Sequence, residues 1–374
     1  MDWNTSNVQY MSNMFYSTNI VNINGLANWN VEKVSDMKQM FGGNKYLADI
    51  SALRTWSIPA LRDVSFMFTS DSALVDISPL ANWDTSRITN LSGLFSLTGV
   101  SDISYLSNWN TSSATKMNRL FEYSKITNTN ALASWNTSKV SEMSGIFRTS
   151  TLSDIGGISS WDISRVEKLD GAFTGASLTN LDALADWDAS SVVNMNYAFG
   201  GMSKLVNLGG IAGWDTSEAT SMDAIFRYDT SLVDLSPVSD WDISKVTDLT
   251  QAFQYDKAIV VLDGLSNWNT SNVQSINLIF DEASSLENID GLTDWNTSNV
   301  TNMRGAFSHL PQLEDLSGIA GWDTSKVTNM QSMFYNDTKI TDLSPLNNWN
   351  TANVTNKADM FYGIPSSVTR PTWY

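Results

Sequence analysis

Large apolar residues recur along this chain in a fixed pattern. Tryptophan marks the frame, at positions 3, 29, 56, 83, 109, 135, 161, 187, 214, 241, 268, 295, 322 and 349, so that successive members stand 26 or 27 positions apart. Each of these fourteen tryptophans is followed twelve positions later by a phenylalanine, from Phe15 to Phe361. A spacing kept over the whole chain is typical of a repeat protein, in which each unit packs only on its neighbours.

Other positions keep the same frame when they are numbered from the tryptophan. Aliphatic residues stand at −9, −6 and −3, as in Leu232, Leu235 and Val238 before Trp241. Further apolar residues stand at +5, +8 and +11, and thirteen of the fifteen methionines fall at +8 or +11. A flexible thioether fills irregular gaps in a core, so we interpret these methionines as core residues rather than metal ligands.

This pattern predicts the elements of one coil. The segment 232–237, with the sequence LVDLSP, is short, aliphatic and closed by a turn residue, which favours a β-strand. Asp or Asn at +1 favours a corner held by bonds from side chains to backbone N–H groups. The apolar spacing from +5 to +12 is typical of one face of a short helix. The segment after the phenylalanine varies in length from coil to coil, which indicates a surface turn.

A single coil of this length cannot bury its own apolar face, so the coils must stack. We therefore predict a leucine-rich-repeat-like solenoid of thirteen or fourteen coils, each with one short parallel strand and one short helical turn. With about 4.8 Å between coils, the molecule would be a monomeric rod of roughly 65 Å. We expect one continuous array over residues 1–349 and a capping repeat with a tail over residues 350–374. Trp3 lacks the aliphatic segment that precedes the other tryptophans, so we also expect the array to be truncated at its N-terminus.

Composition excludes several classes of function. The net charge is −17 and the pI about 4.3, and such an acidic surface repels phosphate backbones, so no nucleic-acid partner is expected. No apolar run is long enough to insert into a membrane. The chain has no cysteine and one histidine, which excludes disulfides, thiol nucleophiles and sites with several histidines. We predict no cofactor.

The first candidate site is a polar, acidic face. Asp or Asn occupies −7 in twelve of thirteen repeats, and the −5 position shares its face if both lie on a strand. The face could bind a protein or glycan, it could bind Ca²⁺ through hard oxygen ligands, or it could be a solvated ladder between coils. No Asp-x-Asp-x-Asp-Gly loop supports the metal. The candidate residues are Asp234, Asp263, Asp290, Asp315 and Asp342.

The second candidate site lies after the phenylalanine of neighbouring coils. Arg227, Tyr228 and Tyr255 stand there, and aromatic residues with polar neighbours suit sugar rings or partner proteins. The alternative is that they only half-cover the edge of the coil, since single exposed aromatic residues are common.

The repeated phrase, as in WDTSKVTNMQSMF from Trp322 to Phe334, resembles the bacterial surface protein 26-residue repeat, a BspA-like branch of the leucine-rich repeats. The resemblance covers about residues 1–363. It implies a secreted or surface-exposed bacterial protein, from Gram-positive or Mycoplasma relatives, that acts as an adhesin or interaction protein. Relatives often carry a cysteine after the phenylalanine, and this chain has none.

Catalysis would require residues that break the pattern and converge in one place, whereas the carboxylates of this chain repeat by column. We therefore predict a scaffold without enzymatic activity that binds a host or matrix protein or glycan and accumulates affinity over several coils. Two other functions stay open. A lyase-like, polysaccharide-active β-helix enzyme would need a cluster of Lys or Arg with Asp that breaks the pattern. An ice-binding protein would use the Thr and Ser rows at +2 and +3, which Ile163, Ala189 and Ile243 interrupt.

Overall fold

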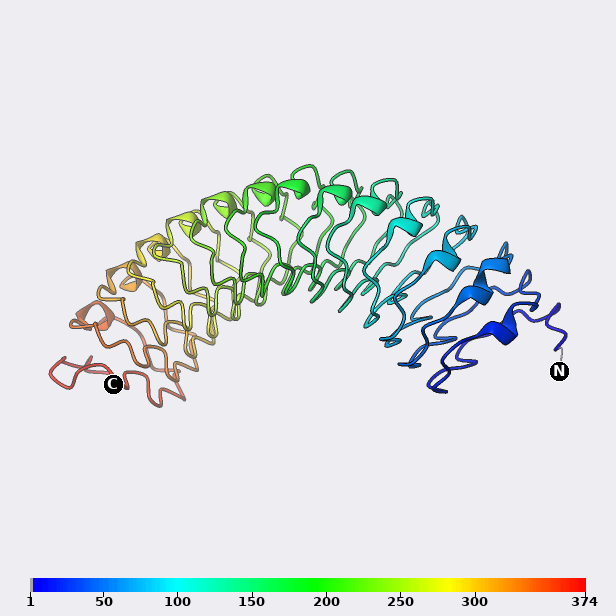
Figure 1. Cartoon of the computed structure of the whole chain (residues 1–374). Coiled ribbons are helices and arrows are strands. Elements are labelled where there is room, and N and C mark those ends of the chain that lie inside the picture. The colour runs from blue at the N-terminus through cyan, green and yellow to red at the C-terminus, as the bar shows by residue number, and fades with distance from the viewer. Residues whose placement is uncertain (1–2) are drawn as a thin grey trace. The chain divides into compact units, whose positions relative to one another are not determined.

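The structure, a computed structural model, describes residues 3–374. They form two compact units, of which one extends to Ser177 and includes Asp186–Ser191, and the other consists of Leu178–Ala185 and Val192–Tyr374. Within each unit the coils lie side by side and follow the spacing of the sequence (Figure 1). The predicted repeat solenoid with short helical turns is therefore confirmed. The continuity of the array over residues 1–349 stays a prediction.

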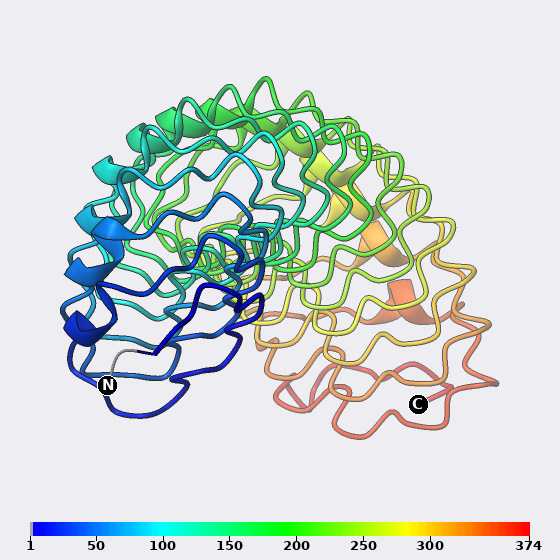
Figure 2. The same ribbon diagram turned by 90° about the vertical axis from the view of Figure 1, so that its right-hand side faces the viewer.

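Among the described residues, each regular element is a 3₁₀-helix that ends shortly before the tryptophan. These helices form a row along one edge of the coils in each unit (Figures 1 and 2). The first unit contains η1 (Asn24–Leu26), η2 (Ser51–Thr55), η3 (Ser78–Leu80), η4 (Ser104–Leu106), η5 (Asn130–Leu132) and η6 (Gly156–Ile158). The second unit contains η7 (Asp182–Leu184), η8 (Gly209–Ile211), η9 (Ser236–Val238), η10 (Asp263–Leu265), η11 (Asp290–Leu292), η12 (Ser317–Ile319) and η13 (Ser344–Leu346).

The β-strand predicted over 232–237 is wrong, because the backbone turns there. Asp234 Oδ1 accepts the backbone N–H of Ser236 at 2.8 Å, which starts η9 two residues later. Pro237 then suits the first turn of a helix, where no N–H is needed. Parallel pairing between described residues of neighbouring coils is limited to isolated bridges, such as those that join Asp248 to Ser221 and Ser275.

The helical segment predicted from +5 to +12 is also wrong, because this part of the coil is a series of turns. Ile225 N–H donates to Met222 O within its own coil at 3.3 Å, whereas Phe226 N–H donates to Ala252 O of the next coil at 3.0 Å. Ala224, at +10, has a φ of 52°, which a helix cannot accommodate. Successive turns bring every third residue to the core, and this spacing resembles that of a helix.

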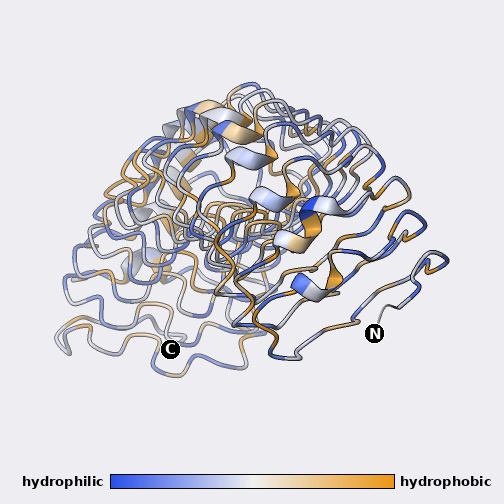
Figure 3. Ribbon diagram, turned by 45° about the vertical axis from the view of Figure 1, so that its right-hand side comes forward, coloured by the Kyte–Doolittle hydropathy of each residue, from blue (hydrophilic) through white to orange (hydrophobic). Residues whose placement is uncertain are grey.

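Tryptophan and phenylalanine rings form the core of each unit. The rings of Phe226 and Phe253 are fully buried and stack at 5.8 Å. The tryptophans make an additional contact that the sequence did not predict: Trp268 Nε1–H donates to Val238 O, at the end of η9 in the preceding coil, at 2.9 Å. Apolar and polar residues therefore alternate along every coil (Figure 3).

The C-terminal tail returns to the core of the last coil. Trp373 stacks on Trp349 at 6.4 Å, and its Nε1–H donates to Leu346 O at 2.9 Å, as the tryptophans of the repeat do. Lys357 occupies the +8 column, and its Nζ donates to the carbonyl oxygens of Trp373 at 2.7 Å and Tyr374 at 3.1 Å. Lysine suits this position because its ammonium group binds the tail.

Candidate interaction surface

The acidic face is exposed, and several of its carboxylates already accept hydrogen bonds from backbone N–H groups. Asp315 Oδ1 and Asp342 Oδ1 accept the N–H groups two residues further on, each at 2.8 Å, as Asp234 does. The bonds that Ser344 donates lower the pKa of Asp342. Asp263 and Asp290 are the first residues of η10 and η11. This ladder of capping side chains explains why Asp or Asn recurs at −7.

Among residues 3–374, no group of three or more His, Asp and Glu side chains is placed to hold a metal ion. Calcium binding by the acidic face therefore stays a prediction for which the described residues offer no grouped ligands. Also among these residues, no helix has the length and apolar character that crossing a membrane requires.

The predicted corner is confirmed as an Asx turn after thirteen of the fourteen tryptophans of the repeat, and Trp56, which is followed by Ser57, is the exception. Asp242 Oδ1 accepts the N–H of Ser244 at 2.8 Å. The threonines at +2 are buried beside it: Thr216 is 2% exposed, and its hydroxyl donates to Asp242 O of the next coil at 3.0 Å. A buried row cannot contact ice, so of the two rows in the ice-binding alternative only the half-buried serines at +3 are left to the surface.

The second candidate site becomes a continuous edge in the second unit. We define the loop edge as positions +13 and +14 in the coils from Trp214 to Trp349. Tyr228 and Tyr255, both at +14, stack at 4.3 Å with their ring planes 6° apart. The guanidinium of Arg227 lies over the Tyr228 ring at 4.8 Å from its centroid. The three predicted residues are thus brought together. The full edge comprises Arg227, Tyr228, Gln254, Tyr255, Asp281, Glu282, Ser308, His309, Tyr335, Asn336, Tyr362 and Gly363.

Position +14 of the loop edge has a left-handed backbone. Such a backbone costs a side chain other than that of glycine about 1 kcal/mol. At +14 the preceding coil carries Gly201 and the last two coils carry Asn336 and Gly363. Glycine and asparagine are the residue types that this conformation favours. Between them, four successive coils carry large side chains with φ between 59° and 70°, namely Tyr228, Tyr255, Glu282 and His309.

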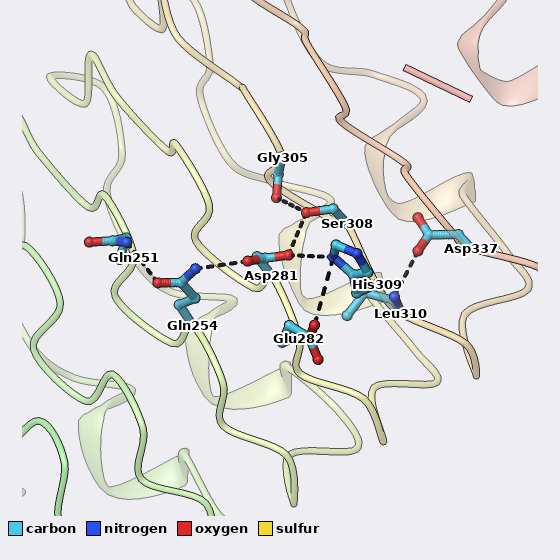
Figure 4. A network of polar contacts seen from close by, with 9 residues as sticks. All are labelled: Gln251, Gln254, Asp281, Glu282, Gly305, Ser308, His309, Leu310 and Asp337. Carbon is cyan, nitrogen blue, oxygen red and sulfur yellow. Dashed lines mark hydrogen bonds and ion pairs between the residues drawn. The ribbon is translucent and has the colours of Figure 1, made fainter. Parts of the chain in front are cut away.

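A polar network fixes the middle of the loop edge (Figure 4). Asp281 accepts three hydrogen bonds, from Gln254 Nε2 at 2.7 Å, Ser308 Oγ at 2.6 Å and His309 Nδ1 at 2.9 Å. Glu282 Oε1 lies 4.0 Å from the same histidine nitrogen. Because Nδ1 donates to a carboxylate, Nε2 of His309 is left for other partners.

A hollow of about 340 Å³ lies beside this network. It forms where Gly305 stands at +10, between Leu278 and Ser332 in the same column of the neighbouring coils. A Cβ on Gly305 would lie 2.5 Å from Leu278 Cδ2 and 3.1 Å from Ser308 Oγ, so glycine lets these two side chains, which line the hollow, lie close to the backbone. Arg304 and Tyr335 line the hollow as well.

The surface turn predicted after the phenylalanine is wrong at +15, where the side chains are buried. Asp256 Oδ1 accepts the N–H of Asp229 at 2.8 Å, while Oδ2 has no partner among the described residues. Burial raises the pKa of Asp71 to about 8. It also raises the pKa of Asp229, Asp256 and Asp337 well above the usual range. Folding takes these carboxyls out of water, and the protonated form is favoured.

Sequence reasoning found the aromatic end of the loop edge and missed the hollow. In the sequence His309 stands out only as the single histidine, and Asp281 and Arg304 do not recur by column. Comparison of the +10 column would have found the hollow, because Gly305 interrupts larger neighbours there.

Stacked coils that repeat one phrase and share a variable edge define a repeat solenoid of the leucine-rich-repeat type, a class of scaffold that serves interaction. The chain belongs to the family described as "Mycoplasma protein of unknown function, DUF285", which matches residues 1–96, 71–180, 149–260, 197–291 and 287–370. The resemblance to bacterial surface repeats is thereby confirmed.

The chain is also similar to two solved bacterial structures. One is an internalin, InlF, from Listeria monocytogenes, with 14% identity over 93% of this chain and 81% of that one and a TM-score of 0.36. The other is a leucine-rich repeat protein from Eubacterium ventriosum, with 15% identity over 92% of this chain and 84% of that one and a TM-score of 0.44. No curated protein matches the chain.

Proposed function

We propose that this protein is an adhesin or interaction scaffold without enzymatic activity, secreted or held at a bacterial cell surface, that binds a host or matrix protein or glycan. The loop edge of the second unit is the contact surface. One observation carries the proposal: four successive coils place large side chains at a position whose left-handed backbone favours glycine. Because neighbouring coils carry different pairs of residues there, the edge offers a partner a specific sequence of contacts.

The acidic face supports this function less well. Its residues repeat from coil to coil, and one carboxylate oxygen of Asp234, Asp315 and Asp342 already holds the backbone. Its exposed charge still contributes to the long-range field of the molecule, which slows the approach of acidic partners and attracts basic ones.

Binding of the full chain to arrays of glycans and of host matrix proteins tests the proposal. Replacing both Tyr228 and Tyr255 with alanine should weaken binding to the captured partner by about tenfold or more, as expected for central aromatic contacts. The matched control replaces Asp315 and Asp342 with asparagine, which keeps the capping oxygens and leaves binding by the loop edge unchanged. Loss of binding in the control with none in the tyrosine variant would transfer the function to the acidic face. Absence of any bound partner would overturn the proposal.

The enzyme alternative does not gain from the hollow. Arg304 and Asp281 do line the same hollow, and a lyase would need such a pair of residue types. However, both oxygens of Asp281 accept hydrogen bonds from Gln254, Ser308 and His309, so this carboxylate is not free to take a proton from a substrate.

A further inference from the structure

We propose that the hollow beside Gly305 binds one uronic acid ring, with its carboxylate on Arg304. This deepens the proposed function, on which it rests, because it names the ligand class for one part of the loop edge. The volume of about 340 Å³ is at the small end of the range for ligand pockets, which suits a single sugar ring rather than a long chain.

Arg304 supplies the recognition of charge. Its side chain is exposed and takes part in none of the ion pairs found among residues 3–374. No other arginine among these residues takes part in one of the ion pairs either, so it is the place of Arg304 in the wall of the hollow that singles it out. A guanidinium presents parallel N–H groups that match a carboxylate in a bidentate pair.

The remaining walls fit a ring with hydroxyl groups. Tyr335 offers its ring edge to the C–H groups of a sugar, and its position is fixed because it stacks on Tyr362 at 4.8 Å and contacts the His309 ring at 5.2 Å. His309 Nε2 and the Ser332 hydroxyl stand at the polar side and can exchange hydrogen bonds with sugar hydroxyls. A glutamate side chain from a peptide would satisfy Arg304 and leave these two groups without partners.

The histidine is held ready for this contact. Its Nδ1 donates to Asp281 at 2.9 Å, and Asp281 is itself held by Gln254 and Ser308 at 2.7 and 2.6 Å (Figure 4). Asp281 is therefore a positioning residue, since its oxygens are used within the network. A ring fixed before binding loses little freedom when a ligand arrives.

The single histidine makes the test direct. The Cε1–H NMR signal of His309 needs no assignment against other histidines, so the full chain can be titrated with glucuronate, glucose, acetate and a glutamate-containing tripeptide. We expect the signal to move saturably with glucuronate, with an apparent Kd at least about tenfold lower than for glucose or acetate. An unmoved signal, an equal response to acetate, or tighter binding of the peptide would overturn the proposal.

Two variants and a matched control locate the site. Arg304→Gln should remove the preference for glucuronate over glucose. Gly305→Ala should weaken the response, because its methyl group would displace the Leu278 side chain that lines the hollow, and the backbone tolerates alanine since Ala224 has a φ of 52° in the same column. The control is Gly171→Ala, also at +10 with a φ of 63°, in a coil where the added Cβ meets nothing closer than 3.4 Å. An unchanged response in Gly305→Ala would place the ligand elsewhere.

The two proposals fail separately. If the chain binds a matrix partner through Tyr228 and Tyr255 while glucuronate leaves the His309 signal unmoved, the uronate site is wrong and the scaffold function stands. If no array partner binds but the His309 signal responds to glucuronate, the site stands as a small-molecule site and the proposed scaffold function is wrong.

Discussion

Each tryptophan of the repeat combines two stabilising contributions. Its ring fills the core, and its Nε1–H satisfies a carbonyl at the end of a 3₁₀-helix in the preceding coil, as Trp214, Trp241 and Trp268 do at 3.1, 3.0 and 2.9 Å. The carbonyls of Ile211 and Val238 each accept one backbone N–H within their own coil, and the indole of the next coil supplies a second donor where water would otherwise bind. Phenylalanine would fill most of the same volume but could not donate, which explains why the column is tryptophan throughout.

Replacing Trp268 with phenylalanine should therefore destabilise the protein although most of the ring is kept. The Val238 carbonyl would keep the N–H of Trp241 at 3.2 Å, so loss of the indole hydrogen bond should cost about 0.5–1.5 kcal/mol, and a small cavity would add to this. Urea unfolding followed by circular dichroism measures the loss. The control is Trp3→Phe, since Trp3 is 59% exposed, and it should change the midpoint little. Equal midpoints for both variants would show that the indole hydrogen bond contributes nothing.

At the residue scale, the sequence predicts which residues form the core, but it does not predict the hollow at the loop edge. Apolar columns follow from periodicity alone, and Phe226 and Phe253 are buried as expected. The hollow depends on how the Leu278 side chain lies against Gly305 and on the direction in which Asp281 and His309 point. Such directions are set by turns, which the spacing of apolar residues does not specify.

At the scale of elements, the local assignments failed because turns and helices share a spacing. An apolar residue at every third position is expected for a short helix, and it is equally produced by successive turns with a left-handed backbone at +10 and +14. The backbone N–H groups decide between them. In this chain alternate N–H groups donate to the next coil, as Phe226 does to Ala252, which a helix would not allow.

The turn after the phenylalanine contains the clearest local conflict. Asp256 is buried with one oxygen unpartnered, whereas Asn44, in the same column, donates from Nδ2 to the Phe15 carbonyl at 2.8 Å and also to the Phe41 carbonyl. Asparagine has the donor that an ionised aspartate lacks. A protonated aspartate has one as well, which agrees with the raised pKa of Asp256 that burial produces.

Replacing Asp256 with asparagine should accordingly stabilise the protein at pH 7. Folded Asp256 retains a proton that the unfolded chain has released at pH 7, and asparagine avoids this cost. The gain should be about 1.4 kcal/mol for each pH unit above about 3.9 over which folded Asp256 stays protonated. The midpoint of urea unfolding at pH 7 measures the effect. Asp256→Ala is the control and should destabilise, since it also removes the acceptor for the Asp229 N–H. A less stable asparagine variant would contradict this account of the turn.

At the scale of the whole molecule, folding shifts the pKa values of two sets of carboxyls in opposite directions. The exposed set accepts hydrogen bonds from serine in Asx turns, which lowers the pKa of each member: Asp49, Asp84, Asp102, Asp162, Asp215, Asp242, Asp323 and Asp342. The buried set, Asp71, Asp229, Asp256 and Asp337, has a raised pKa because folding removes these groups from water. The Asx turns and the buried aspartates at +15 thus both make the stability of the fold depend on pH.

The two pKa shifts contribute to stability with opposite signs, and together they determine the pH range in which the fold is most stable. A lowered pKa stabilises the fold above the unfolded value of about 3.9, and this contribution is lost as pH falls below it. A raised pKa means that the folded state holds a proton that the unfolded state has released. The free energy of unfolding then falls as pH rises above about 3.9, by about 1.4 kcal/mol per pH unit for each such proton, until the folded group ionises. For Asp71 this decline extends to about pH 8.

The fold should therefore be most stable in mild acid and lose stability between about pH 5 and 8, although most carboxylates of its surface are ionised throughout. Repulsion within a chain of net charge −17 acts in the same direction, because it grows as protons leave. Urea midpoints at pH 3, 5 and 8 measure the profile. A variant with both Asp71→Asn and Asp256→Asn should flatten the decline between pH 5 and 8 and leave the loss below pH 4 unchanged, because that loss belongs to the exposed set. A midpoint that rises toward pH 8 would mean that the buried carboxyls ionise without cost.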